Sequence, residues 1–552
     1  MDTRSQVPAR RLTSRDGRLD ALGLSIGPSA YNPRMSSSRR SVGLEVGAAS
    51  FLCLLLGLPS LTFPMGVDQG TLGVWAQQLA RGLVPYRDVW DQRPPLMHLL
   101  HFLVYAGGVS GMELTRVTDL LVQVATAGVL GLLALRMFGR GAGILAGALY
   151  AYCYFGQADF HHTSQPDGLV GLFAALAILF ALQSGPKRRL LSGAMLGLAF
   201  LAKYPAALLF PVLVGIAPEG GDWKRRARQA MEVALGAAVP VLSLIVWLAA
   251  TGALGDFLMD TVVFNLGHGK IGTERPELSM QALEVLAQLL NRREVLAPLL
   301  LLPLARLERR STLVAGAWGL VSFLMVLVQR KFFSYHFLPL VAPLALLSAG
   351  AVRGLALRLV AEPAPRMRKV TWAIALVLTL GAGYRTAARW GRSAVAAVQV
   401  ASDDEARRAF HALHVNPFLG FSLGDDLEAA AAIKAMARPG DRLLVFGAPL
   451  LYYLSELQPA TRFIMDSPFV AKGHPERYDR ELERALDSRP PEFVAVYLRN
   501  TCRAVTGYDE PSASLLRLQP KAQRRLAELE KVLELETVAV YASRERAAAL
   551  AP

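Results

Sequence analysis

Residues 46–64 read VGAASFLCLLLGLPSLTFP, a run without a single charged side chain. The hydrocarbon core of a bilayer is ~30 Å thick, and an α-helix needs ~20 apolar residues to cross it. This run therefore predicts a transmembrane helix. Over the whole chain of 552 residues, 53% are hydrophobic and only 19% are charged, a composition that ordinary soluble domains do not have.

Further apolar runs follow along the chain, and their boundaries are approximate. They cover residues 115–135, 142–157, 168–183, 190–203, 204–218, 230–251, 294–306, 312–329, 336–352 and 370–385. Together with the first run they predict a mainly α-helical, polytopic membrane protein of about 11 transmembrane helices. Residues 190–218 are open to a second interpretation, as one long helix kinked near Lys203 and Pro205.

The net charge is +15, with 59 Lys and Arg against 44 Asp and Glu. In a soluble protein this balance would suggest a nucleic-acid partner. Here the basic residues gather in short loops between apolar runs, as at 187–189 and 224–228, which is the pattern of cytoplasmic loops. We therefore expect no nucleic-acid partner, a cytoplasmic N-terminus and an extracytoplasmic C-terminal domain.

Three domains are expected on this basis. Residues 1–42 form a disordered basic cytoplasmic tail, residues 43–386 the transmembrane domain, and residues 387–552 a small soluble α/β domain on the outer face. The transmembrane domain has a first outer loop at 65–114 and a second large outer loop at 252–293. The C-terminal domain has strand-like runs at 442–446, 493–498 and 537–541 and helix-like stretches at 476–486 and 521–533.

The first outer loop carries most of the candidate chemistry. Leu72, Trp75 and Leu79 recur at helical spacing, which predicts a short amphipathic helix along the membrane surface with Asp68 at its start. A second helix is expected from Leu96 to Tyr105, after two prolines. Asp68 has two open interpretations, which are compatible with each other: an N-cap for the first helix, or a catalytic carboxylate at the water interface.

Three segments of this loop resemble the first outer loop of the GT-C glycosyltransferases. They are Asp68-Gln69, GLVPYRD at 82–88 and QRPPL at 92–96. The likeness is to glycosyltransferase family 39, which includes protein O-mannosyltransferases and lipid A aminoarabinose transferases. It covers about residues 46–350, with weaker matches at Arg116, 138–140, 197–203 and 335–339.

The resemblance implies an inverting glycosyltransferase in the plasma (inner) membrane of a bacterial cell envelope. Such an enzyme passes a hexosyl or pentosyl group from a polyprenyl-phosphate donor to a hydroxyl of a lipid, glycan or protein acceptor at the outer face, surrounded by membrane lipid. Asp68 is then the general base, and Arg93 binds the donor phosphate. The family often has glutamate where Gln69 stands, and some members have an acidic residue at the position of Gln92, so Asp91 is assigned a supporting role.

Other polar residues have both a functional and a structural interpretation. Lys203, Arg330 and Lys331 are candidates to bind the donor phosphate, and they also suit membrane-interface anchors. Tyr335 and His336 are likewise candidates for a phosphate or sugar contact or for an interface anchor. Arg87 and Asp88 are candidates to support the site, and they also fit a solvated turn with surface ion pairs. His268 and Lys270 are candidates for an acceptor gate.

No cofactor is expected to be required, while assistance by a divalent metal stays open. His161, His162 and Asp167 have weak metal-ligand spacing, and because adjacent histidines do not easily share one tetrahedral site, a polar rim that contacts substrate or water is the favoured interpretation. The competing function is that of a transporter or flippase for a lipid-linked saccharide, which would place buried charges near the bilayer midplane. A third alternative is a non-catalytic scaffold that displays the C-terminal domain.

Overall fold

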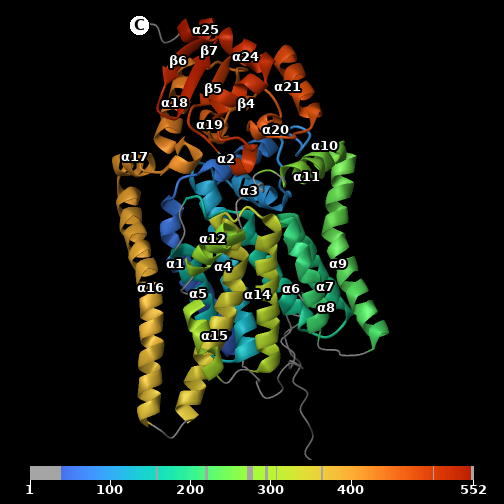
Figure 1. Ribbon diagram of the computed structural model, residues 1–552, viewed down its shortest axis with the longest axis vertical. Coiled ribbons are helices and arrows are strands. Elements are labelled where there is room, and N and C mark those ends of the chain that lie inside the picture. The colour runs from blue at the N-terminus through green and yellow to red at the C-terminus, as the bar shows by residue number, and fades with distance from the viewer. Residues whose placement is uncertain are drawn as a thin grey trace, which may run out of the picture.

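The computed structural model describes residues 39–156, 160–217, 222–269, 271, 278–291, 296–305, 308–361, 365–501 and 503–548. Most of the expected N-terminal tail and Lys270 lie outside these residues. The chain has two layers: a bundle of long helices, and a C-terminal unit (residues 403–548) at one end of the bundle (Figure 1). Two short helices of the first loop, residues 65–114, lie between the layers.

The bundle is built from apolar helices of different lengths. They are α1 (Arg39–Gly57), α4 (Glu113–Phe138), α5 (Ala142–Gly156), α6 (Pro166–Ala181), α7 (Pro186–Ala202), α8 (Phe210–Ile216), α9 (Trp223–Ala250), α14 (Arg309–Gln329), α15 (Leu338–Ala361) and α16 (Pro365–Ser402). Shorter segments join them: η2 (Leu58–Thr62), η3 (Tyr204–Leu209), α10 (Leu254–Leu258), the π-helical η4 (Met259–Val263), α11 (Phe264–His268), α12 (Leu278–Leu290), η5 (Ala297–Leu304) and η6 (Ser334–Phe337).

Five helical segments in the described part of the chain are long and apolar enough to cross a membrane. They are Arg39–Thr62, Glu113–Phe138, Trp223–Ala250, Arg309–Gln329 and Ser334–Val360. The other predicted spans are shorter helices, or in one case part of the longer α16, so the total of about 11 stays a prediction. The chain breaks at Lys203, whose backbone is extended between α7 and η3, which agrees with a break near the expected position.

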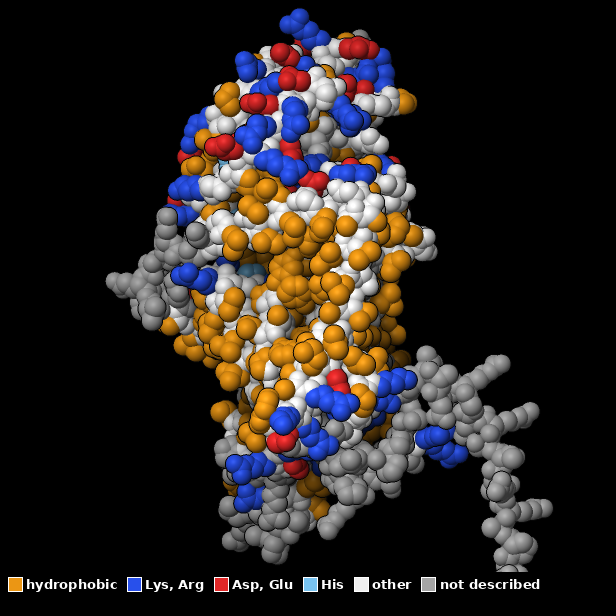
Figure 2. Space-filling view, turned by 90° about the vertical axis from the view of Figure 1, so that its right-hand side faces the viewer, with side chains coloured by type: hydrophobic (Ala, Val, Ile, Leu, Met, Phe, Trp, Pro, Cys, Tyr) orange, Lys and Arg blue, Asp and Glu red, His pale blue; other side chains and the backbone are white. Residues whose placement is uncertain are grey.

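The surface of the bundle matches this assignment. Figure 2 shows a broad band of hydrophobic side chains over the helices, with acidic and basic side chains gathered on the C-terminal unit and at the opposite end. On α9 the apolar side chains of Met231, Leu235, Val239 and Val246 are exposed. Such a large exposed apolar surface is stable in lipid and not in water, so the protein is an integral membrane protein.

Glycines bring two of the helices unusually close. A Cβ atom added to Gly193 or Gly197 of α7 would clash with the backbone of α9 at Val233 or Ala237. On α9, Gly236 meets the backbone of Leu190 in the same way. Small residues at such crossings let membrane helices pack backbone to backbone, since no hydrophobic effect drives them together in lipid.

The first loop forms the two helices that its sequence predicts, but not in the expected setting. Helix α2 (Val67–Ala80) and helix α3 (Leu96–Ala106) are both present. Leu72 and Trp75 of α2 are fully buried, as are the polar Gln69 and Gln78. The expectation of an amphipathic helix on the membrane surface is therefore wrong, because the C-terminal unit covers the side of α2 that would otherwise face water.

The C-terminal unit is an α/β structure around a five-stranded sheet. The strand order is β4-β3-β5-β7-β6, with β4, β3 and β5 parallel and β7 and β6 antiparallel to their neighbours. The strands are β3 (Arg442–Phe446), β4 (Gln458–Pro459), β5 (Phe493–Tyr497), β6 (Glu530–Glu534) and β7 (Val538–Ala542). A separate two-stranded pair joins β1 (Val415–Asn416) to β2 (Phe421–Ser422).

The helices of this unit cover the sheet and connect its strands. They are α17 (Asp404–Ala412), η7 (Pro417–Leu419), α18 (Leu423–Met436), α19 (Leu450–Ser455), α20 (Ser467–Val470), α21 (Glu476–Ser488), α22 (Arg503–Thr506), α23 (Ser512–Leu515), η8 (Leu516–Leu518), α24 (Pro520–Ala527) and α25 (Arg544–Ala547). The three predicted strands are confirmed, as is the helix at 476–486. The predicted helix at 521–533 is wrong in its second half, because α24 ends at Ala527 and β6 follows.

Arg462 joins the C-terminal unit to both loops of the bundle. Its guanidinium donates to the carboxylate of Asp260 in η4, with Nη1 2.7 Å from Oδ2, and to the carbonyl oxygen of Tyr86 at 2.9 Å. Its Nε donates to Glu481 on α21 at 2.8 Å, and Tyr478 donates to Asp260 at 2.8 Å. Such a satisfied buried network fixes the orientation of the unit on the first loop.

A buried carboxyl in the C-terminal unit predicts a pH-dependent stability. Asp426 on α18 is fully buried and accepts a hydrogen bond from Tyr497 at 2.6 Å. Burial, with the neighbouring Asp425, raises its pKa to about 8. Because the folded state holds this proton more tightly than the unfolded state does, the stabilisation is complete below the unfolded pKa and is lost as the pH rises towards 8.

Asp426→Asn mimics the protonated form. We expect this variant to be more stable than the wild type at pH 8, by on the order of 1 to 3 kcal/mol, and to approach it at pH 4. Thermal unfolding of the purified protein at both pH values measures the difference. A variant that is less stable at pH 8 would show that the carboxylate is charged and stabilising there.

Candidate active site

The candidate site lies where helix α2 begins, between the bundle and the C-terminal unit. Gly66 is the N-cap residue and Asp68 lies in the first turn of α2, where the partial positive charge of the helix terminus favours a carboxylate. The carboxylate of Asp68 does not cap the helix. Oδ1 accepts from Arg93 Nη2 at 2.5 Å, and Oδ2 accepts from Gln165 Nε2 at 3.1 Å.

The N-cap interpretation of Asp68 is therefore wrong, and its neighbour Gln69 supplies the capping instead. The side-chain oxygen of Gln69 accepts from the backbone N–H of Gly66 at 3.2 Å, which is the N3 half of a capping box, since Gly66 has no side chain for the other half. Its side-chain nitrogen donates to the carbonyl oxygen of Thr163 at 2.6 Å. An ionised glutamate at this position cannot donate to a carbonyl oxygen, which explains in this chain the departure from Asp-Glu.

Arg93 is held between two carboxylates. Its side chain is 21% exposed and its partner Asp68 is 30% exposed, whereas Asp91 is buried. Nη1 lies 3.7 Å from Asp91 Oδ2, and the backbone N–H of Arg93 donates to Asp91 Oδ1 at 2.9 Å. Burial opposes the charge of Arg93, yet Asp91 and Asp68 together raise its pKa above the usual value.

Asp91 positions Arg93 and is itself held by a buried histidine. His98 on α3 lies 2.8 Å from Asp91, and its ring packs on Trp75 with ring centroids 4.2 Å apart. Burial alone would raise the pKa of Asp91, but Arg93 and His98 hold it below its usual range. Asp91 therefore contacts Arg93, as its expected supporting role requires, and that role stays a prediction. His98 is a member of the cluster that the sequence did not reveal.

A second charged pair lies beside the first. Lys203, at the break after α7, forms an ion pair with Asp167 in the first turn of α6. Its ammonium lies 5.9 Å from the centre of the Tyr335 ring, and it interacts electrostatically with Asp68 and Arg93. Lys203 and Tyr335 therefore belong to the same site as Asp68, although they come from distant helices.

Arg116 ties together the segments on either side of this site. Its guanidinium is completely buried, and it donates to the carbonyl oxygens of Phe63, Pro64 and Phe160 and to Thr163. These acceptors lie just before α2 and in the turn before α6. Arg116 thus holds the N-terminus of α2 against that turn, because the five N–H donors of one planar guanidinium can bond several carbonyl groups at once.

Several predicted site residues lie elsewhere. Arg87 and Asp88 pair with each other at 2.7 Å and stabilise the turn after α2, as Asp88 also accepts from Val84 N–H. Arg330 is exposed and ends α14 in a left-handed conformation. Lys331 contacts His268 of the second loop at 2.7 Å and donates to the carbonyl oxygen of Ala504 in the C-terminal unit at 2.6 Å. Lys331 therefore joins the second loop to the C-terminal unit.

The histidines near the site contact separate partners. His161 interacts with Asn416 of the C-terminal unit at 2.8 Å, and His162 interacts with Ser334. His336 is buried close to Lys203 and Lys331. Within the described ranges, no three His, Cys, Asp or Glu side chains are grouped so that they would hold a metal ion. The arrangement provides instead one accessible carboxylate beside two cations, a geometry suited to proton transfer next to a phosphate.

The helix bundle, the first loop and the charged site can be compared with those of known proteins. Residues 92–248 match the family model described as dolichyl-phosphate-mannose-protein mannosyltransferase. The crystal structure of ArnT from Cupriavidus metallidurans bound to undecaprenyl phosphate is similar over 94% of this chain and 100% of that chain, with 16% identity and a TM-score of 0.57.

The apo structure of the same ArnT is similar over 93% of this chain and 99% of that chain, with 15% identity and a TM-score of 0.54. A search of curated proteins by sequence found no significant match. The chain thus has the GT-C fold of membrane glycosyltransferases, and it resembles the protein mannosyltransferases and ArnT. This confirms the resemblance that the first loop indicates.

Proposed function

We propose that the protein is an inverting glycosyltransferase that moves a sugar from a polyprenyl-phosphate donor to an acceptor hydroxyl at the outer face of the membrane. The observation that carries this proposal is the Asp68–Arg93 pair, whose carboxylate and guanidinium lie 2.5 Å apart and are both partly accessible. Transfer needs a base for the acceptor and a cation for the departing phosphate within the space of one sugar ring.

The reaction then follows from the two charges. Asp68 takes the proton of the acceptor hydroxyl as the acceptor oxygen forms a bond to the anomeric carbon of the sugar. The bond between that carbon and the phosphate oxygen breaks on the opposite face of the ring, which inverts the configuration. Polyprenyl phosphate leaves with added negative charge, and Arg93 stabilises that charge more in the transition state than in the ground state.

The neighbouring residues have supporting roles in this proposal. Lys203 adds a second cation beside the leaving phosphate, while Asp167 holds its side chain in place. Asp91 and His98 keep the Arg93 backbone in position. The apolar bundle gives the long prenyl chain of the donor a place in the bilayer while its sugar reaches water.

One observation favours the competing function, transport of a lipid-linked saccharide. Asp119 on α4 is buried within the bundle, where Tyr154 and Gln123 donate to one of its carboxylate oxygens. Ionisable groups at such positions often line substrate pathways. A transporter moves the intact donor across a membrane without breaking its glycosidic bond.

Sugar transfer by the purified protein tests both functions. The protein is reconstituted in liposomes with radiolabelled polyprenyl-phosphate sugars, both hexosyl and pentosyl, and with envelope lipids and glycans as acceptors. We expect labelled product together with free polyprenyl phosphate, formed with inverted anomeric configuration. Movement of intact donor across the bilayer without release of polyprenyl phosphate would favour the transporter and contradict the proposal.

A further inference from the structure

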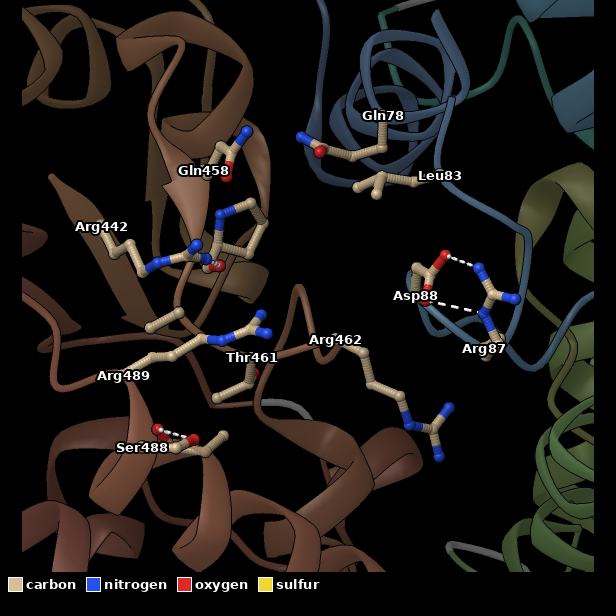
Figure 3. Close-up of a pocket in the computed structure, with 13 residues that line it drawn as sticks. Gln78, Leu83, Arg87, Asp88, Arg442, Gln458, Thr461, Arg462, Ser488 and Arg489 are labelled. Atoms are coloured by element: carbon tan, nitrogen blue, oxygen red, sulfur yellow. Dashed lines mark hydrogen bonds and ion pairs between the residues drawn. The ribbon is translucent and has the colours of Figure 1, made fainter. Parts of the chain in front are cut away.

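A cavity of about 300 Å³ lies between the first loop and the C-terminal unit. One wall is formed by Gln78 of α2 and by the turn with Arg87 and Asp88. The other wall comes from β3, β4 and the end of α21, and it contributes Arg442 and Arg489 (Figure 3). We call this space the interface cavity. Its size is at the lower end for small-molecule binding sites.

The interface cavity is strongly basic. Its wall contains four arginines, Arg87, Arg442, Arg462 and Arg489, and one acidic residue, Asp88. Asp88 neutralises Arg87, and Asp260 with Glu481 neutralises Arg462. Two positive charges are left among the described residues of this wall. The guanidinium of Arg442 donates to the carbonyl oxygen of Pro459, a neutral group, and Arg489 is exposed at the C-terminal end of α21.

These two charges come from separate elements and lie on the same side of the cavity (Figure 3). Beside Arg442, the carboxylate of Glu492 accepts from the backbone N–H of Arg442 at 2.7 Å. Two guanidinium groups on one wall present planar sets of N–H donors, which suit the oxygens of a phosphate or carboxylate.

A second, independent observation points to a ligand with hydroxyl groups. Gln78 is 1% exposed, and neither its side-chain nitrogen nor its side-chain oxygen has a hydrogen-bond partner among the described residues. Its amide points across the cavity towards Gln458 (Figure 3). Buried amides are almost always satisfied in folded proteins, and a sugar hydroxyl both donates to and accepts from an amide.

We propose that the interface cavity binds an anionic sugar, a saccharide that carries phosphate or carboxylate. Arg442 and Arg489 bind the anion, and the Gln78 amide contacts a ring hydroxyl. If the protein is the transferase proposed above, this sugar is part of its acceptor. The inference of an acceptor role rests on that function, whereas the binding itself does not.

The place of the cavity along α2 separates it from the transfer site. Gln78 lies ten residues after Asp68 on the same continuous helix, which corresponds to roughly 15 Å at ~1.5 Å per residue. A bound anion there does not compete with the donor phosphate. An acceptor that occupies both places must span this distance, which indicates an oligosaccharide or a glycolipid headgroup rather than a monosaccharide.

Calorimetric titration tests the site directly. The full chain in phosphatidylcholine nanodiscs is titrated with glucose 1-phosphate, inorganic phosphate and glucose. We expect glucose 1-phosphate to bind more tightly than inorganic phosphate, and glucose to show no binding. Arg489→Gln, an exposed position at the end of α21, should weaken binding of glucose 1-phosphate by tenfold or more, and the matched control Arg484→Gln on the same helix should not change it.

A second variant separates the amide from the charges. Gln78→Met should reduce the affinity for glucose 1-phosphate while leaving inorganic phosphate unchanged, and it should not lower the thermal stability because it removes an unsatisfied amide. Equal binding of glucose and glucose 1-phosphate, or unchanged binding by Arg489→Gln, would overturn the proposal. A sugar-phosphate glycolipid added to the nanodiscs competes with the probe if the natural anion is lipid-anchored.

The binding result is independent of catalysis. Asp68→Asn should bind glucose 1-phosphate as the wild type does, since that side chain lies outside the cavity. If the wild type transfers no sugar yet Arg489→Gln loses binding, the proposed function fails and the anion site stands. If transfer is observed and no anion binds, only the anion site fails.

Discussion

Asp68→Asn should lower the rate of sugar transfer by roughly 10²- to 10⁴-fold, the usual contribution of a general base. Asparagine has nearly the same shape and can still accept a hydrogen bond from Arg93, but it cannot take the proton of the acceptor hydroxyl. The measurement is the initial rate of transfer in the reconstituted system at saturating donor. Because the change removes a group that acts in the transition state, kcat should fall while the affinity for the donor changes little.

Glu113→Gln is the matched control for this variant. Glu113 is exposed at the end of the same loop, in the first turn of α4, so the same change of charge should leave transfer near the wild-type rate. Thermal unfolding of both variants checks that each is folded. Transfer by Asp68→Asn within a few fold of the wild type would remove Asp68 as the base.

Arg93→Gln should lower transfer by about 10²- to 10³-fold, the cost of losing one donor to a developing oxyanion. Arg93→Lys keeps the charge but has no planar fork, so it should recover part of the rate. The loss should be larger for donors with poorer leaving groups, since these develop more negative charge on the phosphate oxygen. Initial rates with two donor phosphates of different leaving-group acidity measure this dependence.

Arg81→Gln controls for the loss of a cation from this part of the chain. Arg81 directly follows the last residue of α2, and its guanidinium donates to the carbonyl oxygen of Glu456 at 2.9 Å. Its removal should leave transfer unchanged. Three results together would indicate a structural rather than an electrostatic role for Arg93. They are equal slowing of Arg93→Gln with all donors, no partial recovery of the rate in Arg93→Lys, and no rescue of Arg93→Gln by added guanidinium.

The local elements of this protein follow from short-range patterns. Three strands of the C-terminal sheet lie at the predicted positions because their β-branched and apolar runs are short and bounded by polar residues. Helix α3 begins at Leu96 because two prolines precede it. The apolar spacing in the second half of 521–533 suits a helix as well as a strand, and pairing with β7 makes this segment the strand β6.

The members of the site differ in how far the sequence reveals them. Asp68 and Arg93 are found by the resemblance of one continuous loop. His98 and Gln165 have no such signal, because a buried histidine in an apolar helix and a glutamine before a proline are common without function. Gln165 lies 97 residues from Asp68 in the chain, yet it donates to the same carboxylate.

The sequence by itself determined that the chain enters a membrane and that one polar loop carries a carboxylate and an arginine. Both conclusions depend only on the composition of stretches about as long as one transmembrane helix. The hydrophobicity and charge of such a stretch can be read without knowing its partners in the fold. Only the tertiary structure decided that Asp68 pairs with Arg93 instead of capping its helix, and that Lys203 with Asp167 joins the same site. It also decided that α2 is buried under the C-terminal unit, because contacts between segments hundreds of residues apart depend on packing that no local pattern encodes.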